Sequence, residues 1–166
     1  PAGGRWGIYS FGAADSVTTA TLPMRCHTDH GRRGQRCSAP PLACSPMAAR
    51  AYLVRHGETA WSLDRRHTGR TDVPLTDEGR RRAAQLRGPL GALPGVADAL
   101  VLTSPLRRAV ETCELAGLGD RAERCDDLLE WDYGEFEGTR TGDLRVADPE
   151  WSIWTAEIAQ GESLAD

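Results

Sequence analysis

Two short apolar runs, each followed by a segment with helical spacing, constrain the fold of this chain more than any other feature. Residues 51–54 (Ala-Tyr-Leu-Val) and 99–103 (Ala-Leu-Val-Leu-Thr) carry no charge and end at polar turns. Such runs are typical of parallel strands that are buried on both faces. Strands that alternate with helices form a parallel sheet, and ligands then bind beyond the carboxyl ends of the strands.

Each run is followed by residues that predict the start of a helix. Thr76 suits the N-cap of the first helix, and Pro89 is expected to end or kink it. Ser104 suits the N-cap of the second helix, with Pro105 at the first helical position. The predicted buried faces consist of Ala83, Leu86, Leu90 and Leu93 in the first helix and Leu106, Ala109, Val110 and Cys113 in the second. The sequence therefore predicts an α/β fold, a three-layer α/β/α sandwich with a mostly parallel sheet.

The sheet predicted from this chain is incomplete. Only two strand–helix units are recognisable, and further units of roughly 30 residues each are needed for a doubly wound sheet. After Leu128 the pattern becomes aromatic and is punctuated by glycine, which indicates an irregular, lid-like insertion. Its aromatic residues are Trp131, Tyr133, Phe136, Trp151 and Trp154. We expect residues 47–166 to form the N-terminal part of a domain whose later strands are missing.

Residues 1–46 differ in composition from the rest. They are rich in Gly, Ala, Pro, Ser and Arg, and they show no apolar period of a strand or a helix. We expect a disordered leader, with Met47 as the native start, and an Arg-rich targeting peptide as the alternative. A zinc site at His27 and His30 is conceivable, but the nearby cysteines lack the paired spacing of structural zinc sites, so no metal is expected.

Charge and cysteine content narrow the function classes. All 20 basic residues are arginines, and residues 47–166 hold 15 of them against 22 acidic residues. This acidic balance argues against general nucleic-acid binding and favours a small anionic substrate bound by a local arginine cluster. No segment is long and apolar enough to span a membrane, and the five cysteines form no CxxC pair. A cytoplasmic protein is expected, and the sequence does not indicate its oligomeric state.

The triplet Arg55-His56-Gly57 follows the first predicted strand. An imidazole at that place can attack phosphorus in line, while a neighbouring guanidinium holds the non-bridging oxygens. Gly57 lets a ligand approach the backbone. From spacing alone, either Arg107 or Arg108 on the second helix could face the same site.

An ordered set of motifs follows this triplet. Thr68-Gly69 comes twelve residues after His56, and the chain continues with Asp72, Pro74-Leu75-Thr76, Ser104-Pro105-Leu106-Arg107-Arg108-Ala109 and Glu130-Trp131-Asp132-Tyr133-Gly134. Taken together, the motifs resemble the histidine phosphatase superfamily, also called phosphoglycerate-mutase-like, over residues 51–163. Within it they look most like the sugar-phosphatase branch, which includes sedoheptulose-bisphosphatase-like enzymes.

The resemblance implies a role for each matched residue. His56 matches the phosphohistidine nucleophile, Arg55 and Arg108 the phosphate-binding arginines, and Glu130 the general acid that protonates the leaving oxygen. The matched substrate-contact positions are Ser62, Thr68, Gly69 and Tyr133. The implied activity is hydrolysis of a phosphomonoester, a small sugar phosphate or a related metabolite, with neither metal nor other cofactor.

Two departures from the family pattern bear on the activity. Mutases of the family carry Asn where Ser62 stands and Lys where Thr141 stands. The absence of this Asn and this Lys favours a phosphatase over the alternative of a phosphoglycerate mutase. The family's other catalytic histidine lies on a later strand, and neither His67 nor the two leader histidines can replace it. We therefore expect the chain as given to be inactive or nearly so, and an inactive phosphate-binding module is a further alternative.

Overall fold

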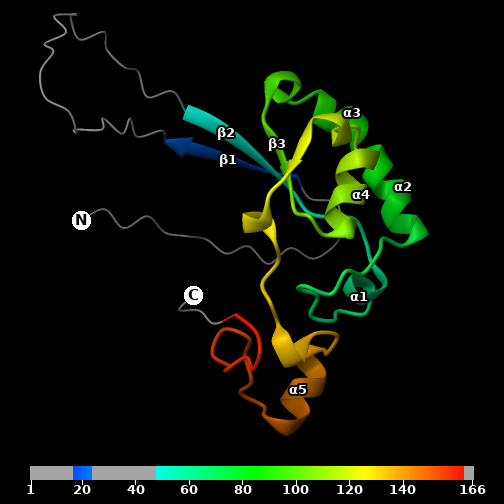
Figure 1. Cartoon of the computed structure of the whole chain (residues 1–166). Coiled ribbons are helices and arrows are strands. Elements are labelled where there is room, and N and C mark those ends of the chain that lie inside the picture. Colours follow the sequence, from blue (N-terminus) through cyan, green and yellow to red (C-terminus); the bar gives the residue numbers. More distant parts are fainter. Residues whose placement is uncertain (1–16, 24–47, 163–166) are drawn as a thin grey trace, which may run out of the picture. The chain divides into compact units, whose positions relative to one another are not determined.

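The computed structural model describes residues 17–23 and 48–162, including the side chains of 50–162. It divides the chain into two units, the first comprising residues 1–15 and 55–166 and the second residues 16–54. The predicted α/β class is confirmed, because helices alternate with strands and two strands pair in parallel. The two units are described separately (Figure 1).

The second unit holds an antiparallel pair of strands. Strand β1 (Val17–Pro23) pairs with β2 (Ala48–Val54), so that Val17 lies opposite Val54 and Pro23 opposite Ala48. The prediction of a buried parallel strand is therefore wrong for this run, since Leu53 is 60% exposed and the pairing is antiparallel. The β-branched residues of β1 supply an adjacent strand within a segment that we expected to lack regular structure. Residues 1–16 and 24–47, which include the expected start at Met47, lie outside the described residues.

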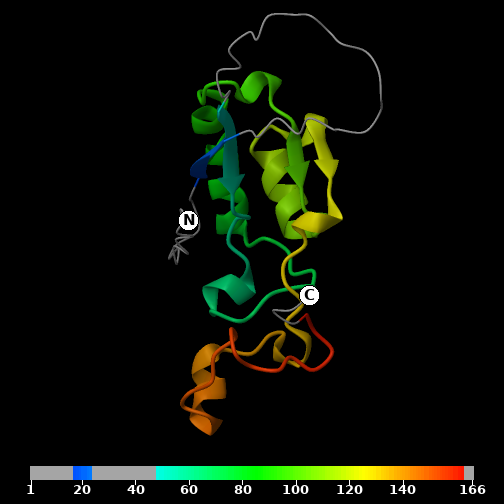
Figure 2. The ribbon, with the colours of Figure 1, turned by 90° about the vertical axis from the view of Figure 1, so that its left-hand side faces the viewer.

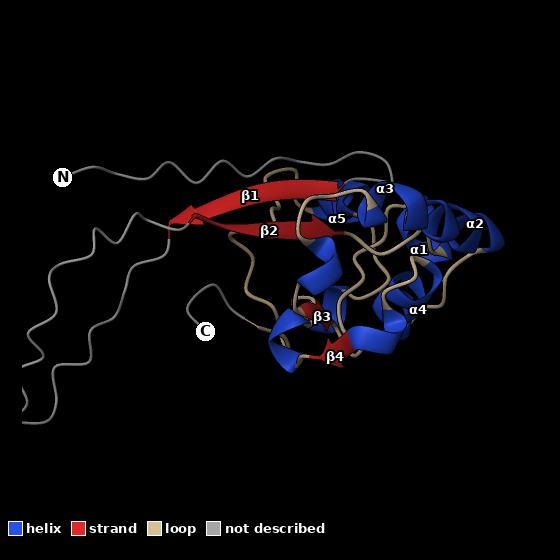
Figure 3. Ribbon diagram, turned by 90° about the horizontal axis from the view of Figure 1, so that it is seen from above, coloured by secondary structure: helices blue, strands red, loops and turns tan. Residues whose placement is uncertain are grey.

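The first unit holds the parallel pair. Strand β3 (Val101–Thr103) runs parallel to β4 (Ala122–Arg124), and the two strands lie side by side in Figure 3. Helix α4 (Arg107–Leu115) connects them and packs on β3, as a crossover helix does. The prediction of parallel pairing is confirmed for this second run.

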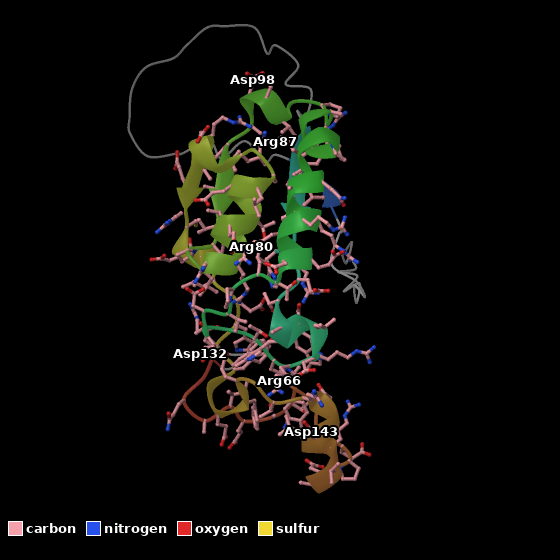
Figure 4. The ribbon with its side chains drawn as sticks, turned by 90° about the vertical axis from the view of Figure 1, so that its right-hand side faces the viewer. Arg66, Arg80, Arg87, Asp98, Asp132 and Asp143 are labelled. Atoms are coloured by element: carbon pink, nitrogen blue, oxygen red, sulfur yellow. The ribbon has the colours of Figure 1, made fainter. Side chains whose placement is uncertain are left out.

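Helix α2 (Asp77–Gln85) packs beside α4 (Figure 1). Its predicted N-cap is confirmed, because the Thr76 hydroxyl accepts a hydrogen bond from the backbone N–H of Gly79 at 2.9 Å. Gly79 itself is buried against the chain that leaves β2, and a Cβ there would overlap the backbone carbonyl of Glu58. The helical path breaks at Leu86, and α3 (Arg87–Gly91) follows with Pro89 inside it. Figure 4 shows the Arg80 side chain of α2 pointing towards α4, where it binds Glu111.

Helix α4 begins two residues later than predicted. Its N-cap is Leu106, and the carboxylate of Asp72 accepts the backbone N–H of Arg107 at 2.7 Å. Ser104 only accepts the N–H of Leu106, at 3.4 Å. The cap is supplied by a residue distant in sequence, which local capping rules could not reveal.

The segment after β4 is more regular than the predicted lid. It contains helix α5 (Thr141–Ala147), which the aromatic pattern did not predict. In Figure 2, α5 and the chain that follows it lie at the end of the first unit opposite α3. This segment is joined to the chain after α1 (Ala60–Leu63) by backbone hydrogen bonds between His67 and residues 138 and 139. Four single-turn 3₁₀ helices complete the described elements: Val96–Asp98, Gly119–Arg121, Asp126–Leu128 and Gly134–Phe136.

Residues 17–23 and 48–162 bear on the expectations about membrane spans, cysteines and metal sites. None of the helices in this part of the chain is long and apolar enough to cross a membrane. Cys113 and Cys125 are both free thiols, and within the same residues no three acidic, His or Cys side chains cluster as metal ligands would. The conceivable zinc site at His27 and His30 lies outside the described residues.

The contact at Gly79 gives a test of the fold. In an open helix, Gly→Ala stabilises by about 1 kcal/mol. At Gly79 we expect the reverse, because the added methyl overlaps the Glu58 carbonyl and overpacking costs about 1–3 kcal/mol. Urea unfolding of the Gly79→Ala variant should show a lower free energy of unfolding than the unmodified protein.

The matched control is Gly142→Ala in α5, where no atom apart from the chain neighbours and the helix's own backbone lies within 4 Å of the added Cβ. This variant should be as stable as the unmodified protein or more stable. Equal stability of the two variants would contradict the packing of α2 on the chain around Glu58.

Candidate active site

His56 is the first predicted site residue, and its ring is fixed by the next residue along the chain. The Nδ1 atom lies 2.7 Å from the carbonyl oxygen of Gly57. Since a carbonyl can only accept, Nδ1 carries the proton and Nε2 holds the free lone pair. Burial, together with the charges of Arg108 and Arg55, lowers the pKa of His56 from 6.5 to about 4, although the Gly57 hydrogen bond opposes the shift. The imidazole is therefore neutral at neutral pH, and Nε2 can act as a nucleophile.

Gly57 is held from the other side by helix α4. Its backbone N–H donates to the hydroxyl of Thr112 at 2.9 Å, and that hydroxyl donates to the carbonyl of Arg108 at 2.7 Å. Thr112 is only 4% exposed. A Cβ at Gly57 would stand 2.8 Å from the carbonyl oxygen of Gly79, so α2 limits this position to glycine. The chain that carries His56 is thus fixed by both helices.

Arg108 has the largest of the fully buried side chains among the described residues, at 2% exposure. Its guanidinium donates to three backbone carbonyls of one loop: Gly69 at 2.8 Å, Thr71 at 3.0 Å and Thr68 at 3.4 Å. The guanidinium carries more N–H donors than these bonds use. Spacing alone allowed either Arg107 or Arg108 to face the site. The structure exposes Arg107 and buries Arg108.

The same loop is held through its N–H groups by Glu137. One carboxylate oxygen, Oε1, accepts the backbone N–H groups of Gly69 at 2.8 Å and Arg70 at 2.9 Å, and Oε2 accepts that of Thr71 at 3.3 Å. Gly69 is buried, and a Cβ there would overlap both this carboxylate and the carbonyl of Trp131. The predicted substrate-contact pair Thr68-Gly69 is therefore held in place by Glu137 and Arg108. Figure 4 labels Arg66 and Asp132, which lie in the adjoining segments.

The remaining predicted site residues, Glu130, Tyr133 and Arg55, interact electrostatically with Arg108. Burial lowers the pKa of the Arg108 guanidinium, while Glu130, Asp72 and Glu137 act in the opposite direction. Burial also raises the pKa of Tyr133, an effect to which Glu130 adds, so the phenol keeps its proton. Glu130 is exposed, as is Arg55, and the guanidinium of Arg55 has no hydrogen-bond partner within residues 48–162. Arg55 and Arg108 thus act electrostatically on both His56 and Tyr133, and Glu130 acts on Arg108 and Tyr133.

Ser62 is placed differently from the other predicted residues. Its hydroxyl donates to the carbonyl of Thr59 at 3.0 Å and accepts the N–H of Thr59 at 2.9 Å. The Thr59 hydroxyl in turn accepts the N–H of Ser62 at 3.0 Å, which completes a capping box at the start of α1. The only hydroxyl proton of Ser62 is thus already used within the helix cap.

His67 belongs to an aromatic cluster. Its ring centroid lies 5.1 Å from that of Tyr133 and 5.6 Å from that of Trp151. Its Nε2 atom lies 3.2 Å from the hydroxyl of Thr141, the residue at the lysine position of mutases. Burial lowers the pKa of His67, although the Glu137 carboxylate opposes the shift.

Two residues that organise the site were missed by sequence reasoning. Thr112 was not considered, although it lies one helical turn after Arg108 on the same face of α4. Glu137 lies three residues after the Glu130–Gly134 motif and was given no role. A polar residue at a buried helical position is a detectable signal, whereas the reach of Glu137 to the 69–71 loop depends on the tertiary fold.

Comparison with known proteins agrees with this geometry. The chain is 47% identical over 116 residues to an acid phosphatase of Mycobacterium tuberculosis, which covers 70% of the chain and 56% of that protein. It is 34% identical over 138 residues to sedoheptulose 1,7-bisphosphatase of Saccharomyces cerevisiae, covering 70% and 51%. The chain thus spans about half the length of the curated relatives it matches.

Solved structures share the fold. The structure of a Mycobacterium tuberculosis open reading frame is 46% identical, with a TM-score of 0.60 over 67% of this chain and 56% of that one. Phosphoglycerate mutase from Thermus thermophilus is 34% identical, with a TM-score of 0.50 over 67% and 61%. The sequence profile of the histidine phosphatase superfamily (branch 1) matches residues 51–166. A match over that length means that the chain belongs to the histidine phosphatase superfamily.

Proposed function

We propose that this protein is a phosphomonoester hydrolase that acts through a phosphohistidine at His56 on a small sugar phosphate or a related metabolite. The observation that carries the proposal is the state of the imidazole. Its Nδ1 proton is bound by the Gly57 carbonyl and its pKa is lowered to about 4, so the Nε2 lone pair is free. A neutral imidazole beside permanently charged guanidinium groups is the arrangement that phosphoryl transfer to nitrogen requires.

The first chemical step transfers the phosphoryl group to the protein. Nε2 of His56 attacks phosphorus, the bond between phosphorus and the ester oxygen breaks, and Glu130 gives its proton to the leaving oxygen. Arg55 holds the non-bridging oxygens, and Arg108 adds a buried positive charge. In the second step a water oxygen bonds to phosphorus, the N–P bond breaks, and Glu130 takes the proton of the water.

Two observations favour a phosphatase over a mutase. A mutase must keep a phosphorylated intermediate bound and return the phosphoryl group to it, so it benefits from additional cationic anchors. Thr141 stands at the mutase lysine position, and its hydroxyl contacts His67. Ser62 stands at the asparagine position, and its hydroxyl is used in the capping box. Thr141 therefore offers no charge that would hold a second phosphate, and the hydroxyl proton of Ser62 is not free to be donated to one.

Phosphoenzyme formation tests the mechanism directly. The protein expressed from the complete open reading frame is incubated with a phosphorus-labelled chromogenic monoester, and acid-labile label on the protein and released phosphate are measured. We expect the His56→Gln variant to lose both signals, because Gln offers no nucleophilic nitrogen.

His67→Gln is the matched control, since His67 is likewise a partly buried histidine that lies outside the proposed reaction centre. It should retain the label. If the unmodified complete protein takes up no label and releases no phosphate, the phosphate-binding module becomes the better interpretation. Transfer of the label to a second hydroxyl of the substrate, in preference to water, would instead indicate a mutase.

The lowered pKa of His56 predicts activity in acid. Protonation removes the nucleophile, so a free-enzyme pKa of about 4 keeps the imidazole reactive well below the ordinary value of 6.5. A measured acid limb of kcat/KM near or above 6.5 would contradict this. The name of the Mycobacterium tuberculosis relative, acid phosphatase, is in line with the expectation.

Substitution of Arg55 tests the cause of the lowered His56 pKa. Its positive charge lowers the pKa of His56, and the side chain is exposed without a hydrogen-bond partner in residues 48–162. Arg55→Gln should therefore move the acid limb of kcat/KM to higher pH, in addition to weakening catalysis. Arg55→Lys keeps the charge and should leave the limb in place, whereas equal limbs in both variants would assign the shift to burial and Arg108.

A further inference from the structure

Three consecutive backbone N–H groups, of Gly69, Arg70 and Thr71, point at a single carboxylate. Glu137 accepts all three at 2.8, 2.9 and 3.3 Å, and its side chain is partly buried. A carboxylate that accepts several N–H groups is a strong, charge-assisted anchor for a loop. The loop cannot rotate these groups away without leaving a buried charge short of partners.

The opposite side of the same loop meets Arg108. The carbonyls of Gly69 and Thr68 accept from its guanidinium at 2.8 and 3.4 Å, and they share peptide units with the N–H groups of Arg70 and Gly69 that Glu137 holds. The N–H groups and carbonyls of a peptide chain are fixed relative to one another by the planar peptide unit. Glu137, by holding the N–H groups, therefore sets the direction of the carbonyls that orient the guanidinium.

We propose that Glu137 is a positioning residue for phosphate binding, acting on the guanidinium of Arg108 through the backbone of residues 69–71. This inference rests on the proposed function, because it takes Arg108 as part of the phosphate site. The loop is also tied at its outer side, where the Arg70 side chain pairs with Glu162. That ion pair leaves the direction of the carbonyls to Glu137 and Arg108, since it acts on a side chain only.

The direct measurement is the binding of inorganic phosphate by isothermal titration, using the protein from the complete open reading frame. In Glu137→Gln the acceptor of the Gly69 and Arg70 N–H groups loses its charge and the amide nitrogen faces the N–H of Thr71, so the peptide units that carry the Thr68 and Gly69 carbonyls are held less firmly. We expect phosphate affinity to fall about tenfold, the effect of misplacing one charge-assisted hydrogen bond. The matched control is Glu135→Gln in the same 3₁₀ turn, an exposed carboxylate that should bind phosphate as the unmodified protein does.

A double-mutant cycle separates positioning from general destabilisation. In an Arg108→Lys background the fork of the guanidinium is absent, so Glu137→Gln should weaken phosphate binding by less than twofold further. Equal effects of Glu137→Gln in both backgrounds, or no effect in the unmodified background, would overturn the proposal.

The outcomes also distinguish this inference from the proposed function. Phosphate binding that depends on Glu137 in a protein without turnover would support the positioning role and overturn the hydrolase. Turnover that depends on His56, with phosphate affinity unchanged in Glu137→Gln, would support the hydrolase and overturn the positioning role. A protein that neither binds phosphate nor turns over would overturn both.

Discussion

The buried guanidinium of Arg108 is the interaction on which the rest of the first unit depends. Its three carbonyl partners fix the 68–71 loop, and its own backbone carbonyl accepts the Thr112 hydroxyl, which in turn accepts the N–H of Gly57. One turn of α4 therefore connects the chain of His56 with the loop. A charge this deeply buried is costly unless it is fully bound, so the loop and the helix form as one arrangement or not at all.

The sequence predicted the elements whose signals are local. Thr76 caps α2 as expected, and residues 99–103 include a parallel strand followed by a helix, because capping and strand composition act over a few neighbouring residues. The motifs that resemble the family were also recognisable, since each joins a special residue type to the end of an element. The charge of Arg108, from the second such motif, acts on the His56 imidazole of the first.

The features that could not be predicted depend on partners distant in the sequence. The start of α4 is displaced by the carboxylate of Asp72, and the anchor of the 69–71 loop is Glu137. The strand at residues 51–54 pairs antiparallel with β1, although its composition suited a buried parallel strand. In each case the local pattern is compatible with both outcomes, and a contact across the fold decides between them.

The polar character of the core is itself an argument about function. Arg108 and Thr112 lie on the buried face of α4, which the apolar spacing had assigned to Leu106, Ala109, Val110 and Cys113. An apolar residue at either position would remove the need to desolvate a polar group, and local rules favour such residues. Because both buried groups help to hold the chain beside the His56 imidazole, we infer that they are retained for the geometry of that ring rather than for stability. Stabilising this core with apolar substitutions is therefore expected to loosen the site it surrounds.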